Sequence, residues 1–98
     1  MSRLWVRLVA RHRIAAQQTA QCSWGDQEEA LREICRDLDV PVPLWLRKNE
    51  KEFEDFRRTA FTADNFMESV RFDRMEIEFL DDEDTSRRSR DPRNVFDD

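Results

Sequence analysis

Few residues of this chain could do catalytic chemistry. There is one histidine, His12, and there are two cysteines, Cys22 and Cys35. Nucleophilic catalysis needs a base within hydrogen-bond reach of the nucleophile, but His12 lies in a predicted exposed turn with an arginine on each side. Cys35 falls on the apolar side of a predicted helix, where a free cysteine behaves as a small buried hydrophobe. We therefore predict no catalytic residue, and an enzyme is the least favoured class.

Metal and phosphate chemistry also lack the necessary spacing. A structural zinc site uses four cysteine or histidine ligands in short-spaced pairs, and the three such residues here form no pair. The acidic run at residues 81–84 lacks the spacing and the glycine of a calcium loop, so a solvated run is the favoured interpretation. Phosphate-cradling loops need several glycines, whereas this chain has Gly25 alone. We expect no metal, no cofactor and no small-molecule substrate.

Binding chemistry is better represented, along the first predicted strand. Arginines alternate there with Trp5 and Val9, which would place basic and apolar side chains on one face. A tryptophan can stack on a base while arginines contact phosphate, as in single-stranded nucleic-acid binding. Exposed Trp5 and Val9, with Trp45 beside two prolines, also fit a protein-interaction surface, unless a helix or the tail covers them. The candidate interaction surface consists of Arg3, Trp5, Arg7, Val9, Arg11 and Trp45.

These residues must be positioned by a β-hairpin. Apolar side chains recur at every second position in residues 3–11 and, less regularly, in residues 14–22 from Ile14 to Cys22. Each segment therefore predicts a half-buried strand. The turn between them contains His12 but neither the glycine nor the asparagine that a tight hairpin turn prefers.

Two to three helices are predicted next. The first follows Asp26 as N-cap and ends before Pro41, and its apolar stripe consists of Ala30, Leu31, Ile34, Cys35 and Leu38. Residues 43–58 form either one helix or a short turn followed by a capped helix from Glu50. We expect Leu46, Phe53, Phe56 and Ala60 to share its buried face. Thr62 is the expected N-cap of a short helix through about residue 68.

The third predicted strand spans residues 73–80. Met75, Ile77 and Phe79 alternate there with acidic residues, among them Glu76 and Glu78. If this strand neighbours the first, these carboxylates face the arginines of the first strand and neutralise them. We therefore predict an α+β fold with a three-stranded sheet of order 2-1-3, two to three helices on one face and a charged C-terminal tail.

Several segments resemble a group of short, uncharacterised bacterial proteins. They are residues 3–7 (Arg-Leu-Trp-Val-Arg), 33–41, Trp45-Leu46, 61–66 (Phe-Thr-Ala-Asp-Asn-Phe) and 73–80. The resemblance covers most of residues 2–84, and the arginine- and serine-rich residues beyond depart from it. It implies a bacterial cytoplasmic setting. Because the group has no assigned activity, it implies no site residues.

The length and the net charge of the chain restrict the number of domains and the kinds of partner. A chain of 98 residues has room for one domain, which we place at residues 1–80, with residues 81–98 as a charged and flexible tail. The net charge of −5 disfavours non-specific nucleic-acid binding. Arginines interrupt the N-terminal apolar stretch, and no run approaches the roughly 18 apolar residues of a membrane span. We therefore expect a cytoplasmic protein without membrane contact.

Two functions remain open. The favoured hypothesis is a small non-enzymatic protein-interaction module, with a protein partner or a homodimer. The alternative is single-stranded nucleic-acid binding through the sheet face, which ranks second because Glu76 and Glu78 would neutralise the arginines.

Overall fold

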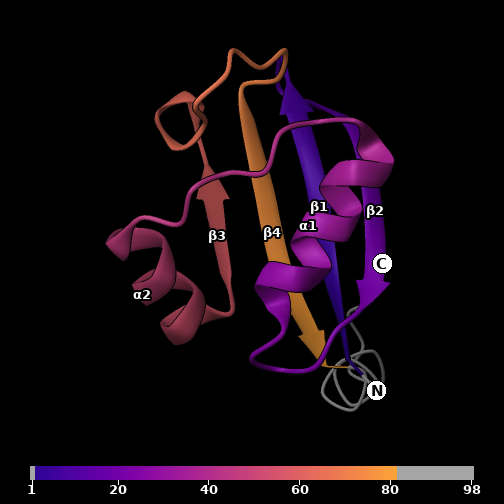
Figure 1. Cartoon of the computed structure of the whole chain (residues 1–98), viewed down its shortest axis with the longest axis vertical. Coiled ribbons are helices and arrows are strands. Elements are labelled where there is room, and N and C mark those ends of the chain that lie inside the picture. Colours follow the sequence, from indigo (N-terminus) through magenta and orange to yellow (C-terminus); the bar gives the residue numbers. More distant parts are fainter. Residues whose placement is uncertain (1, 82–98) are drawn as a thin grey trace, which may run out of the picture.

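The computed structural model describes residues 2–81, which form a four-stranded antiparallel sheet and two α-helices (Figure 1). The sheet has the order β2-β1-β4-β3, and all three neighbouring pairs are antiparallel. In chain order the elements are β1 (Ser2–Ala10), β2 (Arg13–Gln21), α1 (Gln27–Leu38), α2 (Arg47–Phe56), β3 (Arg58–Phe61), the 3-10 helix η1 (Ala63–Asn65) and β4 (Arg74–Asp81). The α+β class is therefore confirmed, and the predicted order 2-1-3 corresponds to β2-β1-β4.

The fourth strand, β3, was not predicted from the sequence. Residue 58 was expected to lie in a helix, but Arg57 adopts a left-handed conformation with a φ of 61° and ends α2. The strand that follows has four residues, of which Thr59 and Phe61 are buried. Four residues are too few for an alternating pattern to separate a strand from a helix end. The expected three-stranded sheet is thus wrong by this one edge strand.

The helices that flank β3 also differ from expectation. α2 begins at Arg47, so neither a start at Pro43 nor a start at Glu50 is correct. The extended backbone of Leu46 precedes it, and the Leu46 N–H donates to Oδ1 of Asn49. Thr62 is an N-cap as predicted, but the helix it starts is the single turn η1.

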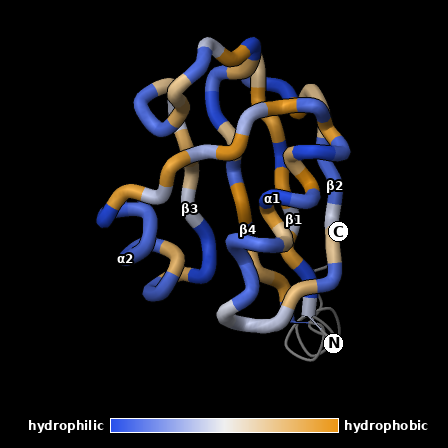
Figure 2. Tube along the Cα trace, viewed as in Figure 1, coloured by the Kyte–Doolittle hydropathy of each residue, from blue (hydrophilic) through white to orange (hydrophobic). Residues whose placement is uncertain are grey.

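The core lies between the sheet and α1. α1 packs over β1 and β2 (Figure 1), and α2 packs against β3. Along β4, apolar residues alternate with charged ones, which Figure 2 shows as alternating colours. The buried side chains include Leu4, Val6, Leu8, Leu31, Ile34, Cys35, Phe53, Phe61, Met75, Ile77 and Phe79.

Three apolar residues predicted to be inside are exposed. Leu46 is 40% exposed and precedes α2 in an extended conformation, so it does not share the helix face of Phe53. Phe56, the last residue of α2, is 67% exposed although it lies only three residues after the buried Phe53. Ile14 is 51% exposed because the strand register shifts between Leu8 and Val9, which places Ile14 opposite Val9 on the other face of the sheet. A single extra residue at such a bulge reverses the face of every side chain beyond it.

Two buried asparagines connect the segments around α2. Nδ2 of Asn49 donates to Oγ1 of Thr59 and to the carbonyl of Ala60, 3.0 Å away in each case. Nδ2 of Asn65 donates to Oδ1 of Asn49 at 2.9 Å and to the carbonyl of Leu44 at 2.8 Å. These bonds hold the connection between the helices against β3 and η1.

The predicted flexible tail lies outside the described residues, apart from Asp81 at the end of β4. Within residues 2–81, neither helix has the length and the apolar composition that crossing a membrane requires.

Candidate interaction surface

The face of the sheet opposite α1 carries the basic and aromatic residues of β1. Trp5 and Arg7 point to this open face, with Glu78 and Glu76 directly opposite them on β4. All four side chains belong to half-buried residues. The alternation of β1 and the antiparallel register of β4 together bring these side chains into neighbouring rows.

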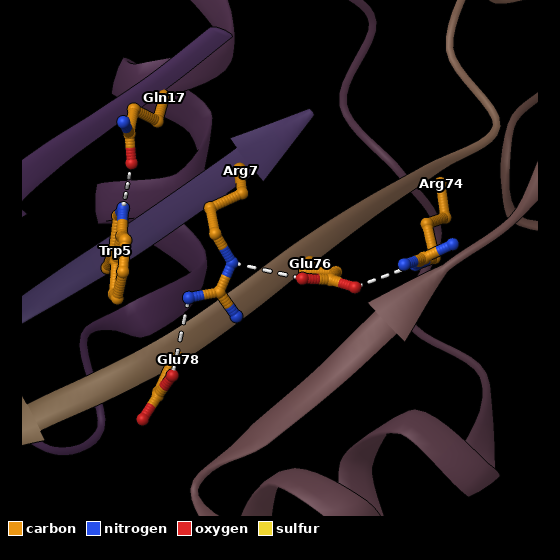
Figure 3. Close-up of polar contacts among 6 residues, drawn as sticks. All are labelled: Trp5, Arg7, Gln17, Arg74, Glu76 and Glu78. Carbon is orange, nitrogen blue, oxygen red and sulfur yellow. Dashed lines mark hydrogen bonds and ion pairs between the residues drawn. The ribbon is translucent and has the colours of Figure 1, made fainter. Parts of the chain in front are cut away.

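Arg7 is neutralised on this face (Figure 3). Its Nε donates to Oε1 of Glu76 at 3.0 Å, and its Nη1 lies 3.5 Å from Oε1 of Glu78. Nε of Arg74 donates to the other oxygen of Glu76 at 2.6 Å. The hydrogen bond from Arg74, followed by that from Arg7, lowers the pKa of Glu76 below its ordinary value. The expected pairing of opposite charges is therefore present at Arg7.

Trp5 is also engaged within the sheet. Its Nε1 donates to Oε1 of Gln17 on β2 at 2.9 Å (Figure 3). The guanidinium carbon of Arg7 lies 4.2 Å from the centroid of the indole ring. A cation–π contact of this kind occupies one face of the ring. A base could stack on that face after displacing Arg7 from its contacts with two carboxylates.

The structure divides the predicted surface. Arg3, like Trp5 and Arg7, is half-buried on the open face, but Val9 is 5% exposed, which corrects the expectation that it projects into solvent. Val9 lies between Ile14 of β2 and Arg74 of β4 in the neighbouring strands.

The other two predicted residues lie elsewhere. Arg11 belongs to the two-residue hairpin turn with His12, and both have positive φ, as a type I′ turn requires. Its backbone N–H donates to Oδ2 of Asp73. Trp45 lies on the helix side, in edge contact with Phe53 and Phe61, with ring centroids 5.5 and 5.1 Å apart. Trp45 is therefore not part of the surface around Trp5.

The outer edge of β2 is a feature that the sequence analysis missed. Cys22 donates its backbone N–H to the carbonyl of Ser2, which sets the phase of the β1–β2 ladder. In an antiparallel pair the bonded positions alternate, so Ala16, Gln18 and Ala20 bond to β1. Gln17 and Thr19 therefore direct their backbone N–H and C=O groups outward. Within residues 2–81, no strand pairs with this edge.

The composition of β2 gives the signal that could have identified it. After Arg13 the strand contains alanine, glutamine, threonine and one isoleucine, with no charged residue and no proline. Native edge strands are commonly protected by charge, proline or shortness. The sequence did not show that β2 lies at an edge, because edge position depends on which strands pair.

The cysteines offer no reactive thiolate. Burial raises the pKa of the Cys35 thiol to about 11, and burial followed by the charge of Asp26 raises the pKa of Cys22. Both thiols are free. In the described part of the chain, no group of three or more histidine, cysteine or acidic residues is arranged to hold a metal ion.

Comparison of the chain with protein-family models, with curated proteins and with solved structures gives no significant match, so its surfaces are interpreted from their own geometry.

Proposed function

We propose that the protein is a non-enzymatic protein-interaction module that self-associates by pairing the outer edges of two β2 strands. The observation that carries the proposal is the edge itself. The strand is nine residues long, no strand within residues 2–81 pairs with its outer edge, and it has no charge after Arg13. The resemblance to short bacterial proteins is the basis for proposing a bacterial cytoplasmic setting.

The two edge strands of the sheet differ in how much unpaired backbone they present. β3 is four residues long and packs against α2, so it presents little edge to a partner. The outward backbone groups of Gln17 and Thr19 on β2 are ready to bond to an added strand. Such main-chain bonds give affinity without a deep pocket. β2 is therefore the edge that a partner strand would extend.

A second copy of the chain suits this edge. Antiparallel pairing about a two-fold axis places β2 against itself, which is the commonest symmetry of homo-oligomers. From Ile14 to Gln21 the strand carries no charge, so no register within this segment places like charges opposite one another. The two sheets would become one of eight strands, with Trp5 and Arg7 one strand away from the interface.

Replacing Thr19 by proline tests the proposal. Proline is tolerated on an edge strand where the lost N–H faces solvent, so Thr19→Pro should fold as a monomer but block pairing. Thr19→Val retains the N–H and is the matched control. Sedimentation across a concentration series should show self-association of the wild type and of Thr19→Val, and a monomer for Thr19→Pro. A monomeric wild type at every accessible concentration would contradict the proposal.

Single-stranded nucleic-acid binding is the second candidate, and it is favoured by the placement of Trp5 beside Arg3 and Arg7 on the open face. The contacts of Arg7 with Glu76 and Glu78 weigh against it. Titration with single-stranded RNA at low and moderate salt separates the two functions, because phosphate contacts make affinity salt-dependent. Salt-dependent binding that is lost in Trp5→Leu would favour the nucleic-acid function.

A further inference from the structure

A groove of about 260 Å³ lies between the first turn of α1 and the exposed side of α2. It is independent of the β2 edge described above. Its lining combines three aromatic rings with three carboxylates, contributed by Trp24, Trp45, Phe53, Glu28, Glu50 and Glu54.

The aromatic rings form the inner part of the groove. Phe53 is 2% exposed and is contacted by both indoles. Trp24 stacks parallel to it, with ring centroids 5.5 Å apart, and Trp45 meets it edge-on at the same separation. Trp24 nevertheless remains 49% exposed. An electron-rich indole is thus held in a fixed orientation and is still accessible.

The carboxylates surround these rings. Glu28 comes from α1, and Glu50 and Glu54 are one turn apart on α2. Like charges at this spacing repel one another on a helix surface. None of the three forms an ion pair with a base in the described part of the chain. A bound cation would therefore relieve repulsion without breaking an existing pair.

A guanidinium already lies beside the same aromatic cluster. Cζ of Arg57, at the end of α2, is 5.7 Å from the ring centroid of Trp24 and 6.0 Å from that of Phe79. These separations fall within the range of cation–π contacts. Trp24 thus contacts a cation within the fold and also lines the acidic groove. A guanidinium entering the groove would contact the part of the indole that Phe53 and Arg57 leave exposed.

We infer that the groove binds an arginine side chain in a basic segment of a partner protein. A guanidinium is planar, so it can stack on an indole while its N–H groups donate to carboxylates at the rim. An ammonium group can supply charge and hydrogen bonds, but it lacks the planar surface that stacks on an indole. The charge complementarity of the groove thus selects a basic peptide over an apolar or acidic one.

The test uses the full chain and a capped Gly-Arg-Gly peptide, followed through the indole N–H resonances of Trp24 and Trp45 by NMR. The peptide with citrulline in place of arginine has the same shape without the charge. We expect the arginine peptide to shift both resonances in a saturable manner, with the citrulline peptide inactive at the same concentrations. Equal binding of the two peptides would overturn the inference.

Matched variants locate the site. Glu50→Gln with Glu54→Gln should weaken binding roughly three- to tenfold, because each exposed ion pair contributes modestly. Glu29→Gln with Glu33→Gln changes the net charge equally on α1 outside the groove and should leave affinity unchanged. Trp24→Leu should weaken binding about two- to fivefold through loss of the cation–π contact. If both double variants weakened peptide binding equally, the attraction would depend only on net charge, and the assignment of the site to the groove would be wrong.

A further variant tests the chain's own arginines as the occupant. Replacing Arg87, Arg88 and Arg90 by glutamine removes the basic cluster near the C-terminus. If a partner supplies the arginine, this variant should bind the peptide with unchanged affinity. Tighter binding would show that the chain's own arginines compete for the groove, and would overturn the assignment to a partner.

Discussion

Glu76 is the residue on which the charges of the open face converge. It accepts hydrogen bonds from Arg7 and Arg74, and these lower its pKa, with Arg74 as the larger cause. A carboxyl whose pKa is lower in the folded than in the unfolded chain stabilises the fold fully above its ordinary pKa of 4.5. This stabilisation is lost as the pH falls through the lowered value.

Glu76→Gln tests that linkage. At neutral pH the variant should unfold more easily by about 1 kcal/mol, because neutral hydrogen bonds replace charge-assisted ones. The difference from the wild type should begin to shrink as the pH falls below 4.5, where Glu76 of the unfolded chain takes up a proton. It should vanish below the lowered pKa, where Glu76 of the folded wild type is also neutral. Urea unfolding from pH 7 to pH 3 measures it. A difference that is constant with pH, or that Glu68→Gln reproduces at an exposed position, would contradict the assignment.

Single residues also show which features the alternation of side chains can predict and which it cannot. The pairing of Arg7 with Glu76 and Glu78 could be predicted because alternation fixes which side chains share a face, and opposite charges favour one another across strands. The burial of Val9 could not, because it results from the neighbours that the register supplies. The same register exposes Ile14.

At the scale of elements, two buried asparagines connect four segments. Asn65 of η1 bonds to Leu44 in the connection between the helices and to Asn49 of α2, which in turn bonds to Thr59 of β3. Both asparagines are fully buried, so any group left unpaired would be costly. The network therefore determines where the connection, α2 and β3 lie relative to one another.

Removal of Asn65 should destabilise the fold strongly. Asn65→Ala leaves the carbonyl of Leu44 and the N–H of Thr62 without their side-chain partner, which should lower the unfolding free energy by about 2–3 kcal/mol. Asn49→Ala combined with Asn65→Ala should cost less than the two changes added, because the residues share a hydrogen bond. Denaturant unfolding of the four chains measures the coupling. Gln18→Ala, which removes one exposed bond to Asp37, should cost little, and strictly additive asparagine effects would argue against a network.

At the scale of the whole molecule, the two proposed surfaces lie on different parts of the fold. β2 forms one edge of the sheet, and α2 lies beside β3 at the opposite edge (Figure 1). A strand added at β2 would leave the groove between α1 and α2 open. The molecule would then pair with a second copy at one edge and still present an acidic groove to a basic segment.

Because the two surfaces are separate, we expect a variant at one of them to leave the other unaffected. Thr19→Pro should abolish self-association and leave the affinity for the arginine peptide unchanged, because distant sites without shared partners act independently. The double change at Glu50 and Glu54 should weaken peptide binding and leave self-association unchanged. Sedimentation and NMR titration of the same samples measure both properties. Loss of peptide binding in Thr19→Pro would mean that the groove depends on association.

The sequence by itself determined the elements with a clear period, namely β1, α1 and β4, and less regularly β2, together with most of the side chains that they direct into the core. Local alternation encodes these features because side chains repeat every 2 residues in a strand and about every 3.6 in a helix. The tertiary structure alone decided the rest, namely the short strand β3, the bulge that turns Ile14 outward, the asparagine network and the position of β2 at an edge. Each of these features depends on contacts between residues distant in the chain. The local spacing of residues does not specify which other segment a given segment will contact.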